Sequence, residues 1–206
     1  MVLKPDSAFQ LPAKQMHLEK LILASRSQRR MEILRAVGWP FEAAAADIDE
    51  SVHAGEDAVS YVKRLALTKA QTVARKSPEG LVLGADTTVV VEGELLGQPA
   101  DDDDARRMLK LLSGKWHEVL TGVALLRVDQ DAPPLVDHET TQVRFAEMSA
   151  GEIDWYVATG EPRGKAGGYG IQGPAALFVE EIAGDYFNIV GLPVRLVYEM
   201  YCKANC

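Results

Sequence analysis

The apolar and polar positions near the start of the chain follow two different periods, one after the other. Leu21 to Leu23 form a short apolar run of the kind that fills a buried strand. Apolar side chains then return at helical spacing, at Ile33, Leu34 and Val37. The pattern predicts a strand, a tight loop that turns at Ser25, and a helix that stops at Gly38.

The rest of the chain alternates between the same two periods. Residues 57–75 carry apolar side chains every three or four positions, which predicts an amphipathic helix. Residues 81–91 are almost continuously apolar and predict a buried strand, followed by a hairpin turn at 92–94. Further strands are expected within 113–127, at 135–145 and at 176–181, and further helices after 101–104, over 149–158 and from 193. We therefore predict an α/β fold with a mixed sheet and two lobes flanking a central cleft.

Two of these helices have clear start signals. Ser149, with Glu152 three residues later, forms a capping box. The run Asp101 to Asp104 precedes apolar positions at helical spacing, and aspartates suit the positive end of a helix dipole. We interpret this run as an N-terminal cap cluster rather than as a cage for a metal ion.

Basic side chains gather at the start of the first predicted helix. Arg26, Arg29 and Arg30 are accompanied by the hydroxyls of Ser25 and Ser27. Backbone N–H groups at a helix start and guanidinium donors both suit phosphate oxygens, which predicts an anion site. The alternative is that a serine only caps the helix and that the arginines are solvated. The basic first turn favours the anion site, because a helix dipole alone would favour acidic residues there.

Carboxylates occur at two places where a cation would stabilise them. Asp86 interrupts an apolar strand, and a buried aspartate is costly without a partner or a metal. Asp47, Asp49 and Glu50 follow the first helix, and they are either metal ligands or members of a polar loop, which is the interpretation we favour. Lys69 lies on the amphipathic helix and joins a site only if its face turns toward a cleft.

A glycine-rich stretch covers residues 160–173. It contains Arg163 and Lys165, and such a loop lets backbone and basic side chains approach a phosphate closely. The Walker pattern is absent, and the stretch is equally typical of a flexible surface hairpin. His117 lies at a strand entrance, where we expect a local hydrogen bond rather than catalysis.

Composition and charge narrow the function. The 206 residues carry a net charge of −8 and are 47% hydrophobic, which predicts a globular protein without binding to nucleic acid or a membrane surface through overall charge. An anionic ligand would then need a local positive site, a divalent metal, or both. No apolar run approaches the ~20 residues that span a bilayer. The first 20 residues contain no signal-like stretch, so we expect a cytoplasmic protein.

The chain ends carry weaker signals. We interpret residues 1–19 as a loosely ordered extension, 20–202 as a single domain of two lobes, and 203–206 as a tail. Cys202 and Cys206 allow a late disulfide, but we favour two tail thiols in a reducing compartment.

Seven stretches between about Leu21 and Pro193 match one known family, in the family's own order. They are LASRSQRRMEIL, DIDES, YVKRLALTKA, LGADTTVVV, LSGKWHEVLTGV, GEPRGKAGGYGIQG and GDYFNIVGLP. With these motifs the chain resembles the Maf family of nucleoside triphosphate pyrophosphatases. The resemblance implies a Maf or ITPase-like fold. It also implies hydrolysis of a nucleoside triphosphate to the monophosphate and pyrophosphate, with Mg²⁺ or Mn²⁺ as the cofactor.

The family's functional positions carry over residue by residue. By resemblance, Asp86 is the proton acceptor and shares the metal with Glu50, and Lys69 is a further catalytic residue. The positions around the triphosphate are Ser25, Arg30 and Lys165, and the three positions tied to base choice are Arg29, Thr87 and Gln172. This trio resembles the dTTP/UTP-type subgroup rather than the 7-methyl-GTP-type one.

Two positions depart from the family pattern. Gln98 replaces the lysine of the usual GKP, and Gly164 replaces the acidic residue before KAG. The first change should weaken phosphate contact by about 1–3 kcal/mol, unless Arg163 or Lys115 compensates.

The expected function is hydrolysis of dTTP, UTP or modified pyrimidine nucleotides. We expect a nucleoside triphosphate substrate and no nucleic-acid or membrane partner, and we leave a homodimer open. The missing lysine motivates an alternative, a nucleotide-sensing interaction protein linked to cell division with weak catalysis. A second alternative is the same reaction on 7-methyl-GTP, which the base-choice trio argues against.

Overall fold

The computed structural model describes residues 18–205, and in this range seven strands form one sheet. The strand order is β2-β1-β3-β5-β6-β7, with β4 paired to β3. The bounds are β1 Leu21–Leu23, β2 Phe41–Ala43, β3 Leu81–Val91, β4 Glu94–Leu96, β5 Trp116–Arg127, β6 Leu135–Phe145 and β7 Val179–Ala183. β1 pairs in parallel with β2 and β3, whereas the other pairs are antiparallel. The mixed sheet confirms the predicted fold class.

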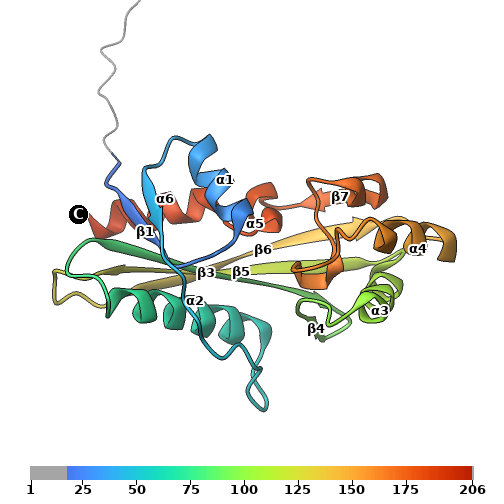
Figure 1. Ribbon diagram of the computed structural model, residues 1–206, viewed down its shortest axis with the longest axis horizontal. Helices are drawn as coiled ribbons and strands as arrows, with labels where there is room; N and C mark the ends of the chain where they lie inside the picture. The colour runs from blue at the N-terminus through green and yellow to red at the C-terminus, as the bar shows by residue number, and fades with distance from the viewer. Residues whose placement is uncertain (1–17, 206) are drawn as a thin grey trace, which may run out of the picture.

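Helices cover both faces of this sheet (Figure 1). Their bounds are α1 Gln28–Ala36, α2 Ala58–Ala74, α3 Asp102–Leu112, α4 Ala150–Ala158, α5 Tyr186–Val190 and α6 Val194–Ala204, with 3₁₀ helices η1 Ala166–Gly168 and η2 Pro174–Phe178. α2 lies on one face, and α1, α5 and α6 lie on the other. Within the described part of the chain, no helix has the length and apolar character that crossing a membrane requires.

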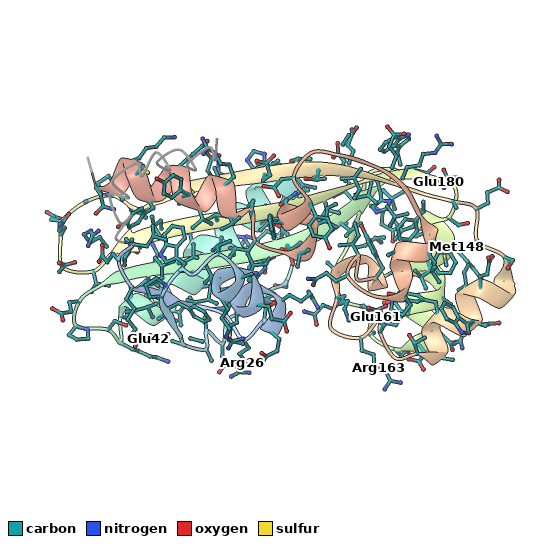
Figure 2. The ribbon with its side chains drawn as sticks, turned by 90° about the horizontal axis from the view of Figure 1, so that it is seen from above. Arg26, Glu42, Met148, Glu161, Arg163 and Glu180 are labelled. Atoms are coloured by element: carbon teal, nitrogen blue, oxygen red, sulfur yellow. The ribbon has the colours of Figure 1, made fainter. Side chains whose placement is uncertain are left out.

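The elements form two lobes that the long central strands connect. One lobe contains β1, β2, α1, α2 and α6, and the other contains β4, α3, α4 and the 3₁₀ helices (Figure 1). Figure 2 shows the two groups of helices separated when the sheet is seen from above. β3, β5 and β6 run through both lobes, and the central strand β5 pairs with β3 on one side and with β6 on the other along almost its whole length.

Two glycines let α2 lie directly on the sheet. A Cβ atom at Gly84 would lie 2.1 Å from the carbonyl oxygen of Ala66, and one at Gly122 would lie 2.2 Å from that of Val62. Only glycine allows this approach between a strand and a helix backbone. Lys69 follows Ala66 by about one helical turn, so the close contact brings its side chain within reach of β3.

One edge of β3 is open in its middle. β5 pairs with Leu81–Val90 on one side, so β1 and β4 must share the opposite edge. β1 covers Leu81–Leu83 and β4 covers Val89–Val91, and no strand of residues 18–205 pairs with the positions between them. This open edge contains Asp86 and Thr87. Because neighbouring strand residues point to opposite faces, a ligand at the edge can meet both.

The structure differs from the predicted elements in two ways. The strand predicted at 176–181 begins only at Val179, because a 3₁₀ helix starts at Pro174 and Ala176 N–H donates to the carbonyl oxygen of Gly173 at 3.0 Å. The sequence pattern also misses α5 and the three-residue strands β2 and β4, which are too short to show a period. The remaining predicted strands and helices are confirmed, including the Ser149 capping box and the Asp101 cap.

The two chain ends are described only in part. Residues 1–17 of the predicted extension lie outside the described range, while the Glu19 carboxylate accepts hydrogen bonds from Arg127 at 2.8 and 3.0 Å. α6 continues to Ala204, two residues past the predicted end of the domain. Cys202 is exposed on α6, but Cys206 lies outside the described residues, so the pair of tail thiols stays a prediction.

Candidate functional site

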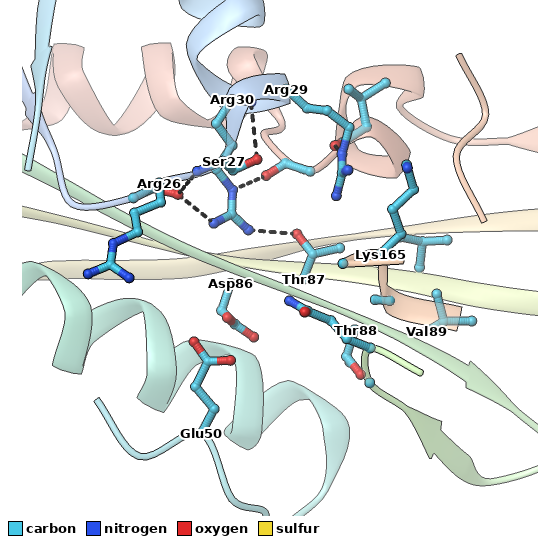
Figure 3. A pocket seen from close by; sticks show the side chains of 18 of the residues that line it. Arg26, Ser27, Arg29, Arg30, Glu50, Asp86, Thr87, Thr88, Val89 and Lys165 are labelled. Carbon is cyan, nitrogen blue, oxygen red and sulfur yellow. Dashed lines mark hydrogen bonds between the residues drawn. The ribbon is translucent and has the colours of Figure 1, made fainter. Parts of the chain in front are cut away.

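A cavity of about 600 Å³ lies along the open edge of β3, between the two lobes (Figure 3). The loop before α1 and the segment after α5 line one side, and the glycine-rich loop lines the other. All nine site residues predicted from the sequence are among the lining residues, namely Ser25, Arg29, Arg30, Glu50, Lys69, Asp86, Thr87, Lys165 and Gln172. The fold therefore brings these residues to one place, although their roles stay predictions.

The acidic end of the cavity contains a lysine between two carboxylates. Lys69 Nζ lies 2.6 Å from Glu50 Oε1 and 2.6 Å from Asp86 Oδ1. Asp86 is only 7% exposed, and its burial raises the pKa of the carboxyl above its ordinary value, while Lys69 and Arg30 oppose the rise. Lys69 thus faces the cavity rather than water, which meets the condition that the sequence left open.

The three carboxylates that the sequence left as either metal ligands or loop residues, Asp47, Asp49 and Glu50, lie in different surroundings. The Glu50 side chain lines the cavity and points toward Asp86 in Figure 3. Asp47 lines the cavity and pairs with Arg26 at 2.9 Å, with both side chains mostly exposed. Asp49 is not a lining residue and accepts a hydrogen bond from Ser51 N–H at 2.9 Å, as a loop residue does.

At the opposite end, Arg30 is buried and held by uncharged acceptors. Its guanidinium donates to Gly191 O at 2.7 Å, to Ser25 Oγ at 3.2 Å and to Thr87 Oγ1 at 3.0 Å (Figure 3). Burial lowers the pKa of Arg30, and the charge of Asp86 opposes this change. Because arginine keeps its proton in proteins, these contacts fix a positive charge at the cavity wall without a directly paired carboxylate among the described residues.

The start of α1 supports both interpretations of its basic residues. Ser27 caps the helix, since its side chain accepts from Arg30 N–H, and Ser25 Oγ accepts from Ser27 N–H at 3.1 Å. The first turn contains no acidic residue. Arg26 also lines the cavity, but it is mostly exposed and pairs with Asp47, as the alternative interpretation predicts, whereas Arg30 is buried.

Two further cations face the cavity from different lobes. Arg29 on α1 donates through Nε to Val190 O at 3.4 Å, and Lys165 of the glycine-rich loop donates to Glu161 O. Burial lowers the pKa of Lys165, and Arg29 lowers it further. Burial also lowers the pKa of Arg29, while Glu161 opposes the change. A bound anion would favour the charged forms of both side chains, as a phosphate site requires.

Hydrogen bonds and aromatic contacts fold the glycine-rich loop onto the sheet. Tyr169 OH lies 2.8 Å from His117 Nε2, and Gly170 N–H donates to Tyr156 OH at 3.2 Å. Gly167 has φ +68°, and a Cβ atom there would lie 2.9 Å from Val89. The loop is therefore packed rather than a free surface hairpin, and the local hydrogen bond expected for His117 is confirmed.

The sequence gives no role to a group of buried polar residues behind Thr87. Thr121 Oγ1 lies 3.0 Å from Thr87 Oγ1 and donates to Asn188 O at 3.1 Å. Asn188 Nδ2 donates to Val119 O at 2.8 Å and to Thr141 Oγ1 at 3.0 Å. Thr121 and Asn188 lie in two of the matched motifs and Thr141 lies in none. Threonines in a strand are ordinary, so nothing in the sequence alone separates Thr121 and Thr141 from other strand residues.

The two departures from the family pattern both line the cavity. Gln98 and Gly164 are lining residues. The proposed compensating residues are not, because Arg163 pairs with Asp102 at 3.2 Å and Lys115 pairs with Glu92 at 2.8 Å. The expectation that either replaces the missing lysine is therefore not supported by their positions.

Glu50 and Asp86 are the carboxylates that could bind a metal ion here. Among residues 18–205 no cluster of three or more metal-binding side chains occurs. Two carboxylates still fit Mg²⁺ or Mn²⁺, because such ions take oxygen ligands and obtain the rest from water and phosphate. Their shared contact with one ammonium group places the oxygens around a single cation position.

The chain is similar to known proteins over most of its length. A family model described as Maf-like protein matches residues 20–204. A protein of Symbiobacterium thermophilum named dTTP/UTP pyrophosphatase is 55% identical over 89% of this chain and 93% of its own. One of Bacillus cereus with the same name is 46% identical over 89% and 90%. The solved structure of the Staphylococcus aureus Ham1 protein aligns with a TM-score of 0.46 at 15% identity, over 63% of this chain and 73% of its own. The match over nearly all of the described residues, together with these close relatives, establishes that the chain belongs to the Maf family.

Proposed function

We propose that the chain is a nucleotide pyrophosphatase that hydrolyses dTTP, UTP or modified pyrimidine nucleotides to the monophosphate and pyrophosphate. One observation carries the proposal: a single cavity has carboxylates, Glu50 and Asp86, at one end and cations, Arg30 and Lys165, at the other. The names of the relatives from S. thermophilum and B. cereus support the same substrates.

The cationic end suits the triphosphate. Arg30, Arg29 and Lys165 lack a direct carboxylate partner among the described residues, so their charges are available to an anion. The N–H groups at the start of α1 add donors at the positive end of the helix dipole. With a net charge of −8, the molecule as a whole repels an anion, and these local charges offset the repulsion.

Asp86 is the general base of the proposed reaction. Its raised pKa makes it a stronger base than an exposed aspartate. As it takes a proton from water, the water oxygen bonds to phosphorus, the anhydride bond between the α- and β-phosphates breaks, and pyrophosphate leaves. Lys69, 2.6 Å from Asp86 Oδ1, orients the carboxylate and helps to keep it ionised.

Glu50 and Asp86 would also hold the divalent cation, Mg²⁺ or Mn²⁺. When bound, such an ion polarises phosphoryl oxygens and offsets their charge. Lys69 contacts both carboxylates, so its ammonium group competes with the ion for the same oxygens. An ion that used Glu50 Oε1 and Asp86 Oδ1 would displace the lysine from these two atoms.

Arg29, Thr87 and Gln172 are the proposed base-reading residues. All three line the cavity, and hydroxyl and amide groups supply the donors and acceptors that a base edge requires. A cytoplasmic location and a homodimer stay predictions.

The experiment is a nucleotide panel in which pyrophosphate release by the full chain is measured with Mg²⁺ and with Mn²⁺. We expect release from UTP and dTTP, and loss of turnover in Asp86→Asn. Asp49→Asn is the matched control, because this carboxylate does not line the cavity, and it should keep wild-type turnover. Release of orthophosphate instead of pyrophosphate, or unchanged turnover in Asp86→Asn, would contradict the proposal.

Gln98 keeps the alternative of a nucleotide sensor open, since it removes a positive charge from the cavity wall. Calorimetry decides between the two functions. Tight UTP binding with no product after long incubation with Mn²⁺ would favour the sensor. Turnover of 7-methyl-GTP in preference to UTP would favour the purine alternative.

A further inference from the structure

Two hydroxyl groups and one backbone carbonyl form a hydrogen-bonded series behind Thr87, the proposed base-reading residue. Thr87 on β3 and Thr121 on β5 are direct partners in the sheet register, and their Oγ1 atoms are 3.0 Å apart. Thr121 in turn donates to the backbone carbonyl of Asn188 at 3.1 Å. Thr121 is fully buried and does not line the cavity, so it can reach a ligand only through Thr87.

The contacts in this series determine where each hydroxyl hydrogen lies. A carbonyl oxygen only accepts, so the single hydrogen of Thr121 is committed to Asn188 O. Thr121 must then accept, and the short contact requires that Thr87 donates to it. The guanidinium of Arg30 only donates, so it occupies one lone pair of Thr87 Oγ1 at 3.0 Å. The position that remains on Thr87 Oγ1 is a lone pair.

From these contacts we infer that Thr121 is a specificity-determining positioning residue, which fixes Thr87 as a hydrogen-bond acceptor toward the cavity. The inference rests on the proposed function. An acceptor at this point suits the N3–H of uracil and thymine and opposes cytosine, whose N3 carries a lone pair. Two lone pairs facing each other leave both groups without a partner, which is the more costly arrangement in a buried site.

The position of Asn188 is itself fixed by the fold rather than by a ligand. Its side-chain amide bridges Val119 O on β5 and Thr141 Oγ1 on β6, and the residue is fully buried. Thr141 also donates to Asp185 O at 3.0 Å and accepts from Asp185 N–H. The carbonyl that takes the Thr121 hydrogen is thus held before any nucleotide binds.

The experiment compares kcat/KM for UTP and CTP in the full chain and in three variants. Thr121→Val removes the acceptor for Thr87 and frees its hydrogen to turn into the cavity. We expect the UTP to CTP ratio to fall by about tenfold or more. Thr121→Ser keeps the hydroxyl and should restore the wild-type ratio. Thr72→Val on α2 is the control: it removes a hydroxyl that donates to Thr68 O at 2.8 Å, lies outside the cavity lining and contacts neither Thr87 nor Asn188, so it should leave the ratio unchanged.

A second arm uses the wild-type chain alone, in case the Thr121→Val variant does not fold. UTP methylated at N3 lacks the hydrogen that Thr87 would accept, whereas 5-methyl-UTP keeps it. We expect the first analogue to lose at least tenfold in kcat/KM relative to the second. Equal kcat/KM values for the two analogues would overturn the inference.

Calorimetry separates this inference from the proposed function. If the wild-type chain binds UTP more tightly than CTP but releases no pyrophosphate, the proposed hydrolysis fails, and the ratio of the two dissociation constants tests Thr121 in the same variants. An unchanged ratio in a folded Thr121→Val protein, or an equal change in Thr72→Val, would show that Thr121 has only a structural role. Binding of neither nucleotide would overturn both.

Discussion

Acid should destabilise the fold through His117. This histidine is 2% exposed, contacts the rings of Phe145 and Tyr169, and burial lowers its pKa to about 4 from an ordinary 6.5. The neutral form is therefore favoured in the folded state. As pH falls below 6.5 the unfolded chain takes up a proton that the folded chain resists, so stability is lost between pH 6.5 and 4. At about 1.4 kcal/mol per pKa unit, the full loss is about 3 kcal/mol.

Urea unfolding between pH 7 and pH 4 measures this loss, and His117→Gln isolates it. Glutamine keeps a neutral hydrogen-bonding side chain near Tyr169 but does not titrate. Titration of the carboxylates changes the stability of both proteins equally. The free energy of unfolding of the wild type should therefore fall by about 3 kcal/mol relative to that of the variant between pH 7 and pH 4. Parallel pH profiles for the two proteins would refute the reasoning, since they would mean that His117 takes up its proton equally in both states.

The other predictions concern the cavity and its support. Lys69→Met removes the nearest positive charge from Asp86, so the pKa of Asp86 should rise and the acid limb of the profile of kcat/KM against pH should move to higher pH. An unmoved limb would mean that Lys69 does not control the ionisation of Asp86. In Arg30→Lys the ammonium group cannot reproduce the planar guanidinium that donates to three acceptors. We therefore expect kcat/KM to fall about 10- to 100-fold for every nucleotide in the panel. Gln98→Lys should tighten triphosphate binding about tenfold in calorimetry, with the gain shrinking at high salt. Gly122→Ala places a Cβ atom 2.2 Å from Val62 O and should lower the free energy of unfolding by about 1–3 kcal/mol or more in urea titrations.

The long elements could be predicted because each repeats its period several times. β3 with 11 residues and α2 with 17 give the hydrophobic pattern room to appear, whereas α5 with five residues does not. Asp86 could be predicted as a site residue for a related reason, since a carboxylate inside an apolar strand needs a cation whatever the fold is.

The burial and hydrogen-bond partners of individual side chains could not be predicted in the same way. Arg26 and Arg30 are four positions apart and chemically identical, yet one is solvated and the other is buried. The difference arises from Gly191 and Thr87, which are remote in sequence and become partners only in the folded chain. Thr121 is a similar case, because its role depends on a carbonyl that a short, unpredicted helix carries.

The open edge of β3 makes both turnover and base selection depend on the register of this one strand. Asp86 and Thr87 are neighbours in sequence, and their side chains lie on opposite faces of the sheet, toward Lys69 and Arg30 respectively. Sliding β3 by a single residue against β5 would exchange these directions. Depending on the direction of the slip, either the acid would take the place of the hydroxyl beside Arg30, or the hydroxyl would take the place of the acid beside Lys69. Turnover and base selection should consequently vanish together when this pairing slips, and neither can be tuned by moving the strand.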